Sequence, residues 1–412
     1  MLVYIINRHG EPLMPCKPRK ARLLLKEDKA KVVKRTPFTI QLLHGSSGYK
    51  QPITLGVDAG SKHVGISATT ENNVLFEAEV KLRNDIVKLL ADRRSLRRNR
   101  RNRKTRYRKA RFDNRKKPKG WLAPSVKNKI DTHIKIIDFV HRILPITKTI
   151  VEAAQFDIQK IKNPNIQGKE YQQGDQLGFW NVREYVFWRD GHHCRGRKGC
   201  KNKILQVHHI ESRKTGGDAP NNLITLCGQC HKDYHAGKLK LNLKRGNSYR
   251  DATFMGIMRW AVYHRLKEKY SNIKLTYGYI TKNIRIKTSL AKSHMVDARC
   301  ISGNPLSKPL NSHYYFKQVR GQNRQLHKAN FKKGIRKANK SPKYVYGFQL
   351  FDKVFYDNQE CFIFGRRTSG YFDLRKLDGT KVHTSANYKK LKPLESASSL
   401  LCERRQGVSS HQ

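Results

Sequence analysis

Four cysteines in two close pairs place the strongest constraint on how this chain can fold. Cys194 and Cys200 form one pair, and Cys227 and Cys230 form the other. Two such pairs can supply the four thiolates of a tetrahedral structural zinc site. The Cys-x2-Cys spacing of the second pair is the stronger evidence for such a site. The five-residue spacing of the first pair is less specific. The remaining cysteines are scattered and follow no signal peptide, so we interpret them as ordinary thiols in a reducing compartment.

The segment between and after the cysteine pairs contains histidines and an asparagine in a set order. His208 and His209 are adjacent, Asn222 follows, and His231 comes directly after the last cysteine. This order inside a cysteine frame resembles the HNH, or ββα-metal, endonuclease motif. The resemblance implies that His209 is the general base, that His208 and His231 hold one Mg2+ ion, and that Asn222 fixes the loop and orients the base. His235 is either a further ligand or a surface histidine.

The net charge points to a polyanionic partner. The chain has 86 Lys and Arg residues against 31 Asp and Glu, a formal charge of +55 over 412 residues. Nucleic acid supplies closely spaced phosphates that neutralise such a charge. A generic basic protein, such as a ribosomal one, is the alternative. No apolar stretch reaches the roughly 18 residues that a membrane span needs, so we expect no membrane contact.

A run of basic residues concentrates this charge. Between Arg93 and Lys119 there are 16 Lys and Arg residues and one acidic residue, Asp113. Arg and Lys favour helix, but like charges four residues apart repel, so we expect this helix to order fully against phosphates. A solvated, partly disordered segment is the alternative. The candidate nucleic-acid contacts are Arg93, Arg94, Arg97, Arg98, Arg100, Arg101, Arg103, Arg106, Arg108 and Arg111.

Three distant segments predict a second site. Asp58 ends an apolar strand, Glu152 ends another, and His294 and Asp297 share one face of a predicted helix over residues 290–301. Together they resemble the split RuvC nuclease, which has an RNase H-like fold. The resemblance implies that Asp58, Glu152 and Asp297 hold two Mg2+ ions and that His294 helps to activate water. Asp157 is a possible bystander, and purely structural carboxylates are the alternative.

Local patterns predict the remaining elements. We expect a rigid loop over residues 12–15 and an amphipathic helix over 125–144. A helix is also expected over 252–270 and a strand-like segment over 273–288. Residues 302–343 are basic, and we expect them to be irregular in structure. Strands are predicted at 344–348, 361–364 and 371–374, which suggests a small β domain.

The layout as a whole resembles the IscB family of transposon-associated, RNA-guided nucleases, regarded as ancestral to the CRISPR type II effector nucleases. Pro12–Pro15 matches the family's PLMP domain, and Arg93–Arg111 matches its bridge helix. The implied fold class is α/β multidomain. The implied domains are a PLMP domain (1–50), a first RuvC segment (51–85), an Arg-rich bridge helix (86–120), a second RuvC segment (121–165), an HNH domain with structural zinc (166–248), a third RuvC segment (249–305) and a C-terminal β domain (306–412).

The resemblance also implies partners and a location. A guide omega-RNA would direct the protein to complementary double-stranded DNA, with HNH cutting the guide-paired strand and RuvC the displaced strand. The C-terminal domain would read a short target-adjacent motif, and the candidate contacts there are Arg366, Arg367, Arg375 and Lys376. We expect a monomeric ribonucleoprotein in the prokaryotic cytoplasm that acts on the nucleoid.

Two other functions remain open at this point. A protein-only HNH endonuclease of the homing or restriction type would explain the cysteine-framed segment and the charge without a guide RNA. It would not explain the second constellation around that segment. A non-enzymatic nucleic-acid scaffold with a zinc ribbon is the other alternative, and the histidines and carboxylates at both sites argue against it.

Overall fold

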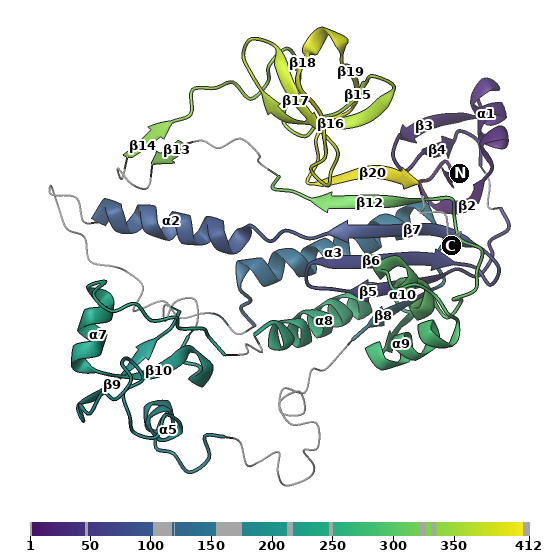
Figure 1. Ribbon diagram of the computed structural model, residues 1–412. Coiled ribbons are helices and arrows are strands. Elements are labelled where there is room, and N and C mark those ends of the chain that lie inside the picture. Colours follow the sequence, from purple (N-terminus) through teal and green to yellow (C-terminus); the bar gives the residue numbers. More distant parts are fainter. Residues whose placement is uncertain are drawn as a thin grey trace. The chain divides into compact units, whose positions relative to one another are not determined.

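The computed structural model describes residues 2–45, 48–101, 118, 120–153, 175–211, 217–246, 250–321, 327–330 and 335–406 (Figure 1). The chain divides into two compact units. Unit 1 comprises Met1–Ala154 and Ile257–Gln412, and unit 2 comprises Gln155–Gly256. Unit 2 is thus an insertion in the sequence of unit 1. Among the described residues, no helix is both long and apolar enough to span a bilayer.

A mixed sheet forms the centre of unit 1. Its strand order among the described residues is β11-β8-β5-β6-β7-β12-β20. β5, β6 and β7 form an antiparallel meander, whereas β8 pairs parallel with β5 and β11 pairs parallel with β8. The strands are β5 (Thr54–Ala59), β6 (His63–Thr69), β7 (Val74–Lys81), β8 (Lys148–Glu152), β11 (Ile273–Thr276), β12 (Ser312–Gln318) and β20 (Leu400–Gln406).

Helices cover both faces of this sheet. Its strands are therefore buried on both sides, which explains their continuous apolar sequences. On one face, Phe139 of helix α3 (Pro124–Ile143) packs near Phe76 and Phe316 of the sheet. The predicted amphipathic helix over residues 125–144 is thereby confirmed. On the opposite face, Arg299 of helix α10 (His294–Ser302) pairs with Glu77, the neighbour of Phe76 in β7. Successive residues of a strand point to opposite faces, so these two contacts define the two layers.

Helix α10 lies unusually close to the sheet. A Cβ atom on Gly56 of β5 would lie 1.9 Å from the carbonyl oxygen of Ala298, and one on Gly65 of β6 would lie 1.8 Å from that of His294. Only glycine fits at either position. Ser293 caps the helix, because its hydroxyl accepts a hydrogen bond from the amide of Val296 at 3.1 Å. The helix therefore begins at His294, four residues later than the sequence predicted.

One helix and the strands of residues 302–343 differ from the elements predicted for unit 1, and one helix agrees. The expected strand over 273–288 is wrong beyond β11, since Gly278–Lys287 forms helix α9. Ile280 and Ile284 are spaced by one helical turn, and the β-branched composition concealed this spacing. The expected irregular segment 302–343 contains β12, β13 (His327–Asn330) and β14 (Ile335–Ala338). The expected helix over 252–270 is confirmed as α8 (Arg250–Lys269).

The N-terminal residues form a separate small sheet with the strand order β2-β1-β4-β3. The predicted rigid loop at residues 12–15 is wrong, because Pro12–Cys16 is strand β2. Proline cannot donate a backbone hydrogen bond, but it is tolerated on an edge strand, and β2 lies at the edge. The other elements are β1 (Val3–Ile6), α1 (Pro18–Lys26), β3 (Ala30–Lys34) and β4 (Thr39–Leu42).

An antiparallel sheet forms the C-terminal β domain, with the order β18-β17-β16-β15-β19. The predicted strand at 344–348 is wrong, because Tyr346 (φ 48°) and Gly347 (φ 79°) form a tight turn that a strand cannot contain. β12 and β20 flank this domain in sequence and pair with each other in the central sheet, so a boundary at residue 306 does not separate the two. Its strands are β15 (Lys353–Tyr356), β16 (Gln359–Arg366), β17 (Tyr371–Arg375), β18 (Lys381–Asn387) and β19 (Lys392–Glu395).

Unit 2 is built on a two-stranded ribbon and its flanking helices. β9 (Leu205–His209) pairs antiparallel with β10 (Leu223–Cys227), and His208 lies opposite Ile224. Helix α7 (Gly228–His235) follows β10 directly, and α5 (Val182–Arg189) precedes the ribbon. Arg189 of α5 donates hydrogen bonds to the carbonyl oxygens of Pro220 and Leu223, at 2.7 and 2.8 Å, and so ties this helix to the start of β10.

Candidate functional site

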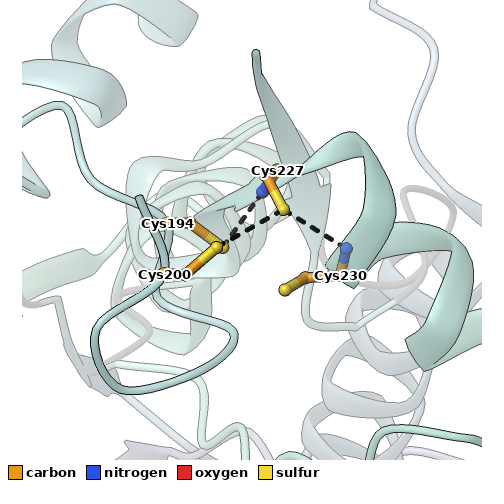
Figure 2. Close-up of side chains that lie close together, drawn as sticks. All are labelled: Cys194, Cys200, Cys227 and Cys230. Atoms are coloured by element: carbon orange, nitrogen blue, oxygen red, sulfur yellow. Dashed lines mark hydrogen bonds between the residues drawn. The ribbon is translucent and has the colours of Figure 1, made fainter. Parts of the chain in front are cut away.

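The four cysteines predicted to bind zinc lie together in unit 2. Their sulfur atoms are all within 4.8 Å of one another, and Figure 2 shows them converging from the loop that carries Cys194 and Cys200 and from the end of β10 with the first turn of α7. The sulfur of Cys194 accepts a hydrogen bond from the amide of Cys227 at 3.1 Å. The sulfur of Cys227 accepts one from the amide of Cys230 at 3.3 Å and so caps α7.

This donor set fits a tetrahedral zinc ion. Three of the four cysteines are buried and Cys200 is half-buried, so a bound ion would be screened from water. Backbone amides directed at sulfur stabilise thiolates over thiols. Gly196 permits the close packing, since a Cβ there would lie 2.7 Å from the Cβ of Cys230. The residues therefore suit a structural metal that joins the β-ribbon to its preceding loop.

A second cluster in unit 2 consists of three histidines. The ring nitrogens of His208, His231 and His235 lie within 4.8 Å of one another, and the Nε2 atoms of His231 and His235 are 3.2 Å apart. His208 comes from β9, and the other two occupy successive turns of one face of α7. The structure thus brings His235, which the sequence left open, together with the two predicted ligands. Imidazole donors favour a divalent transition-metal ion over Mg2+, which prefers oxygen ligands.

Burial favours the neutral form that a metal requires at two of these imidazoles, His208 and His231. The pKa of His208 is lowered to about 4, first by burial and then by the nearby His231, His235 and His209. The pKa of His231 is also lowered, first by burial and then by His235. The neutral rings of His208 and His231 keep their lone pairs available at physiological pH, so they suit a cation.

His209 and Asn222, the other predicted HNH residues, lie beside this cluster. The Nε2 atom of His209 is 2.9 Å from Oδ1 of Asp218, a residue that no sequence pattern singled out. Asn222 is fully buried; its amide donates to the carbonyl oxygens of Glu211 and Gly217, and its carbonyl accepts from the amide of Glu211. Asn222 therefore ties Glu211 to Gly217 in the segment that follows His209.

The predicted second site assembles at one end of the central sheet in unit 1. Asp58 lies near the end of β5, Glu152 ends β8, and His294 and Asp297 lie in the first turn of α10. The Nδ1 atom of His294 is 2.7 Å from Oδ2 of Asp58. Asp58 and Glu152 are each 8% exposed. Because β5 and β8 run parallel as neighbours, their carboxyl ends meet at the same edge, which explains the assembly.

The carboxylates in this cluster influence one another. The pKa of Glu152 is raised by burial and then by Asp58, and that of Asp297 is raised by burial and then by Asp58. In this part of the described structure, the oxygen atoms of these three carboxylates do not all lie within 4.8 Å of one another. A cation among buried carboxylates would relieve their repulsion, so the donor chemistry fits Mg2+.

Two arginines that no sequence pattern singled out bind these carboxylates. The Nη2 atom of Arg259 in α8 lies 3.2 Å from Oε1 of Glu152, and its Nε donates to the carbonyl oxygen of Ala59 at 2.7 Å. Arg285 in α9 lies 2.9 Å from Oδ1 of Asp297. Nothing in the local sequence distinguishes these arginines from the other basic residues of the chain.

A second pair of residues, His63 and Glu79, supports the ring of His294. The ring of His63 in β6 stacks on that of His294, with centroids 5.6 Å apart and planes 2° from parallel. The Nδ1 atom of His63 lies 2.5 Å from Oε1 of Glu79 in β7. Neither residue had a sequence signal beyond its place in a strand. Together with Asp58, they hold the His294 ring in one orientation.

Only the beginning of the basic segment lies within the described residues. Helix α2 (Ile86–Arg101) carries Arg93, Arg94, Arg97 and Arg98 on its accessible surface, and it ends with Arg100 and Arg101. Arg103, Arg106, Arg108, Arg111 and the bystander candidate Asp157 lie outside the described residues.

The candidate contacts of the β domain are engaged within the protein. Arg366 donates to the carbonyl oxygens of Lys343 and Phe348, and Lys376 donates to that of Glu360 at 2.7 Å. Arg375 binds Asp373 and Arg367 binds Ser385. Arg367 is the most exposed of the four, so it is the best placed to meet a nucleic acid.

Comparison with known proteins identifies two segments. Residues 192–237 match the HNH endonuclease family, and residues 3–174 match the family described as RRXRR protein. The chain therefore carries an HNH endonuclease domain, and the match supports a DNA endonuclease. An RRXRR segment followed by an HNH domain fits an IscB-like RNA-guided nuclease, which is the family that the sequence resembles.

Individual relatives cover only portions of the chain. Anaredoxin from Nostoc sp. (strain PCC 7120 / SAG 25.82 / UTEX 2576) is 40% identical over 45 residues, which are 11% of this chain and 59% of that protein. Streptococcus thermophilus Cas9 in complex with the AGAA PAM is 14% identical, with a TM-score of 0.35 over 51% of this chain and 30% of that chain. The complex with the AGGA PAM gives 13% identity and the same TM-score and coverage.

Proposed function

We propose that this chain is an RNA-guided DNA endonuclease with two separate nuclease sites. The observation that carries the proposal is the second site. Asp58, Glu152, His294 and Asp297 come from three distant segments and meet at one end of a sheet, outside the HNH unit. The order β11-β8-β5-β6-β7, with an antiparallel meander and two parallel strands, supports a split RNase H-like domain of the RuvC type. A protein-only HNH nuclease would not need this site.

In the HNH unit, His209 is the proposed general base for cleavage of the guide-paired strand. If Nε2 donates its proton to Asp218, the lone pair on Nδ1 is free to take a proton from water. His208, His231 and His235 would hold one divalent ion, which supplies charge neutralisation at the scissile phosphate. Asn222 keeps the loop after His209 in place. The four cysteines would hold structural zinc and fix α7 against the ribbon.

In the proposed RuvC site, Asp58, Glu152 and Asp297 would hold two Mg2+ ions, which supply charge neutralisation for cleavage of the displaced strand. His294 binds Asp58 through Nδ1, so Nε2 is the ring atom available to a water molecule. Arg259 and Arg285 neutralise Glu152 and Asp297 in this structure. They would have to share these carboxylates with the ions.

The basic residues are proposed to bind the guide RNA. The arginines of α2 lie along a helix whose first turn carries no acidic residue, and phosphates would neutralise their charge. We also propose that the β domain reads a target-adjacent motif. The protein would act as a monomeric ribonucleoprotein on the nucleoid in a prokaryotic cytoplasm.

Strand-resolved cleavage tests the proposal. The protein is purified with its co-purifying RNA, that RNA is sequenced, and a DNA duplex matching its guide segment is labelled on both strands. Asp58→Asn should abolish cutting of the displaced strand alone, and His209→Ala should abolish cutting of the guide-paired strand alone. RNase treatment before DNA is added should abolish both. Cutting that survives RNase would instead support a protein-only nuclease, and no cutting by the intact complex would support a scaffold.

A further inference from the structure

Two exposed tyrosines form a parallel pair on unit 1. Tyr277 is 43% exposed and Tyr279 is 66% exposed. Their ring centroids are 6.2 Å apart and their planes differ by 12°. Proteins bind unpaired bases by stacking them on exposed aromatic rings, since every base has a face that can stack.

The pair lies next to the carboxylate cluster. Tyr277 follows β11 and is the N-cap residue of α9, and Tyr279 is in the first turn of that helix. A Cβ on the intervening Gly278 would lie 3.3 Å from Oε1 of Glu152. The side chain of Thr281, in the next turn, is near enough to Glu152 to lower the pKa of its carboxyl group, against the larger effect of burial, which raises it. The backbone that carries both rings therefore borders the proposed RuvC site directly.

The charge around the pair complements a nucleic-acid backbone. No Asp or Glu occurs between Tyr270 and Val296, a segment rich in lysine. Lys274, Lys282 and Lys287 are exposed, so they are available to phosphates. Stacking rings together with nearby cations are the two components of a surface that binds single strands without sequence preference.

We propose that Tyr277 and Tyr279 form a base-stacking platform that holds single-stranded DNA at the Asp58–Glu152–Asp297 cluster. The inference rests on the proposed function of that cluster and adds the residues that position its substrate. A displaced DNA strand has unpaired bases, whereas a duplex does not. The platform would therefore favour this strand and tolerate any sequence in it.

Two measurements on the full-length ribonucleoprotein test the platform. The first is the cutting rate of the displaced strand relative to the guide-paired strand, which serves as an internal control. The second is binding of a fluorescent oligothymidylate by the Asp58→Asn, His209→Ala double variant, which does not depend on cleavage. The variants are Tyr277→Ala with Tyr279→Ala, the corresponding Phe and Leu pairs, and Tyr49→Ala as a control tyrosine that is 83% exposed elsewhere.

The Ala pair should weaken oligothymidylate binding and slow displaced-strand cutting by about fivefold or more, the loss typical of one stacked base. The Phe pair should keep both values near wild type, whereas the Leu pair should behave like the Ala pair, because leucine has bulk but no π face. Tyr49→Ala should change neither. Unchanged binding in the Ala pair, or full function in the Leu pair, would overturn the platform. Failure of Asp58→Asn to affect displaced-strand cutting would instead overturn the proposed RuvC site, leaving the binding measurement to judge the platform.

Discussion

The imidazole of His294 and the carboxylate of Asp58 lie 2.7 Å apart, from Nδ1 to Oδ2, although 236 positions separate them in the chain. One residue begins a helix and the other lies near the end of a strand. Their contact depends on how closely α10 approaches β5 and β6, and the absence of side chains at Gly56 and Gly65 sets that approach.

Gly65→Ala should therefore disable the proposed RuvC site. Its new methyl group would meet the carbonyl oxygen of His294, so α10 has to move away from the sheet. We expect destabilisation of about 3 kcal/mol and a loss of about 100-fold in displaced-strand cutting, the cost of a misplacement of about 1 Å. Gly45→Ala is the matched control, because nothing lies within 4 Å of that added methyl group. Equal activity of the two variants would contradict this role of Gly65.

Asn222→Ala should affect the other strand. The substitution leaves the amide of Glu211 and the carbonyl oxygens of Glu211 and Gly217 without their partner. The loop after His209 should loosen, with a loss of about 10- to 100-fold in cutting of the guide-paired strand. Asn222→Asp should fare no better, because it restores the acceptor but places a carboxylate against two carbonyl oxygens. Displaced-strand cutting provides the reference rate for both variants.

Cys230→Ser should remove the structural zinc. A hydroxyl is a poor ligand for zinc beside three thiolates, and zinc sites of this size contribute to folding directly. Mass spectrometry of acid-digested protein should show about one zinc equivalent fewer than wild type, and limited proteolysis should cut first within unit 2. Cys402→Ala, at a buried thiol of the central sheet, should keep the full zinc content. Retained zinc in Cys230→Ser would refute the four-cysteine site.

His235→Ala should weaken the metal site formed by the three histidines. With one imidazole removed, the metal concentration needed for half-maximal cutting of the guide-paired strand should rise by about 10-fold or more. Titration of metal-stripped protein should show that Mn2+ or Ni2+ supports this cut at lower concentration than Mg2+. A His235→Ala variant with an unchanged metal requirement would leave His235 as a surface residue.

His133 should make the protein less stable in mild acid. It is fully buried in α3, its Nδ1 donates to the carbonyl oxygen of Lys129, and burial lowers its pKa from 6.5 to about 4. The unfolded chain therefore binds a proton between pH 6.5 and 4 that the folded chain does not. The stability is complete above about pH 6.5 and falls by about 3 kcal/mol as the pH reaches 4.

Urea unfolding of wild type and His133→Leu across this pH range measures the effect. The variant cannot take up this proton, so its unfolding free energy should fall less between pH 6.5 and 4. Parallel curves for the two proteins would show that His133 does not contribute to the pH dependence.

The candidate site residues were easier to predict than the elements around them. Asp58 and Glu152 each ended an apolar run that predicted a strand, and the spacing of His294 and Asp297 predicted one helix face. The structure places all four together. His208 and His231 were recognisable because their types and order have few structural explanations.

Residues that act through long-range packing left no such signal. Arg259 and Arg285 occur among 86 basic residues, and only the fold shows that they meet carboxylates. The edge position of β2 and the return of β20 to the central sheet depend on pairing between distant segments. Local periodicity does not contain that information, whereas the helical spacing within α9 was present but concealed by its β-branched residues.

In the sequence, unit 2 begins and ends close to the two partners of one ion pair of unit 1, Glu152 and Arg259. The chain leaves unit 1 after Ala154, two residues beyond Glu152, and returns at Ile257, two residues before Arg259. An insertion with neighbouring end points can be removed, exchanged or lengthened without altering the hydrogen bonds of the sheet that hosts it. The same holds for the β domain between the paired strands β12 and β20. Protein engineers could therefore treat both as cassettes, and a chain joined directly across residues 155–256 should retain the sheet and nick only one strand.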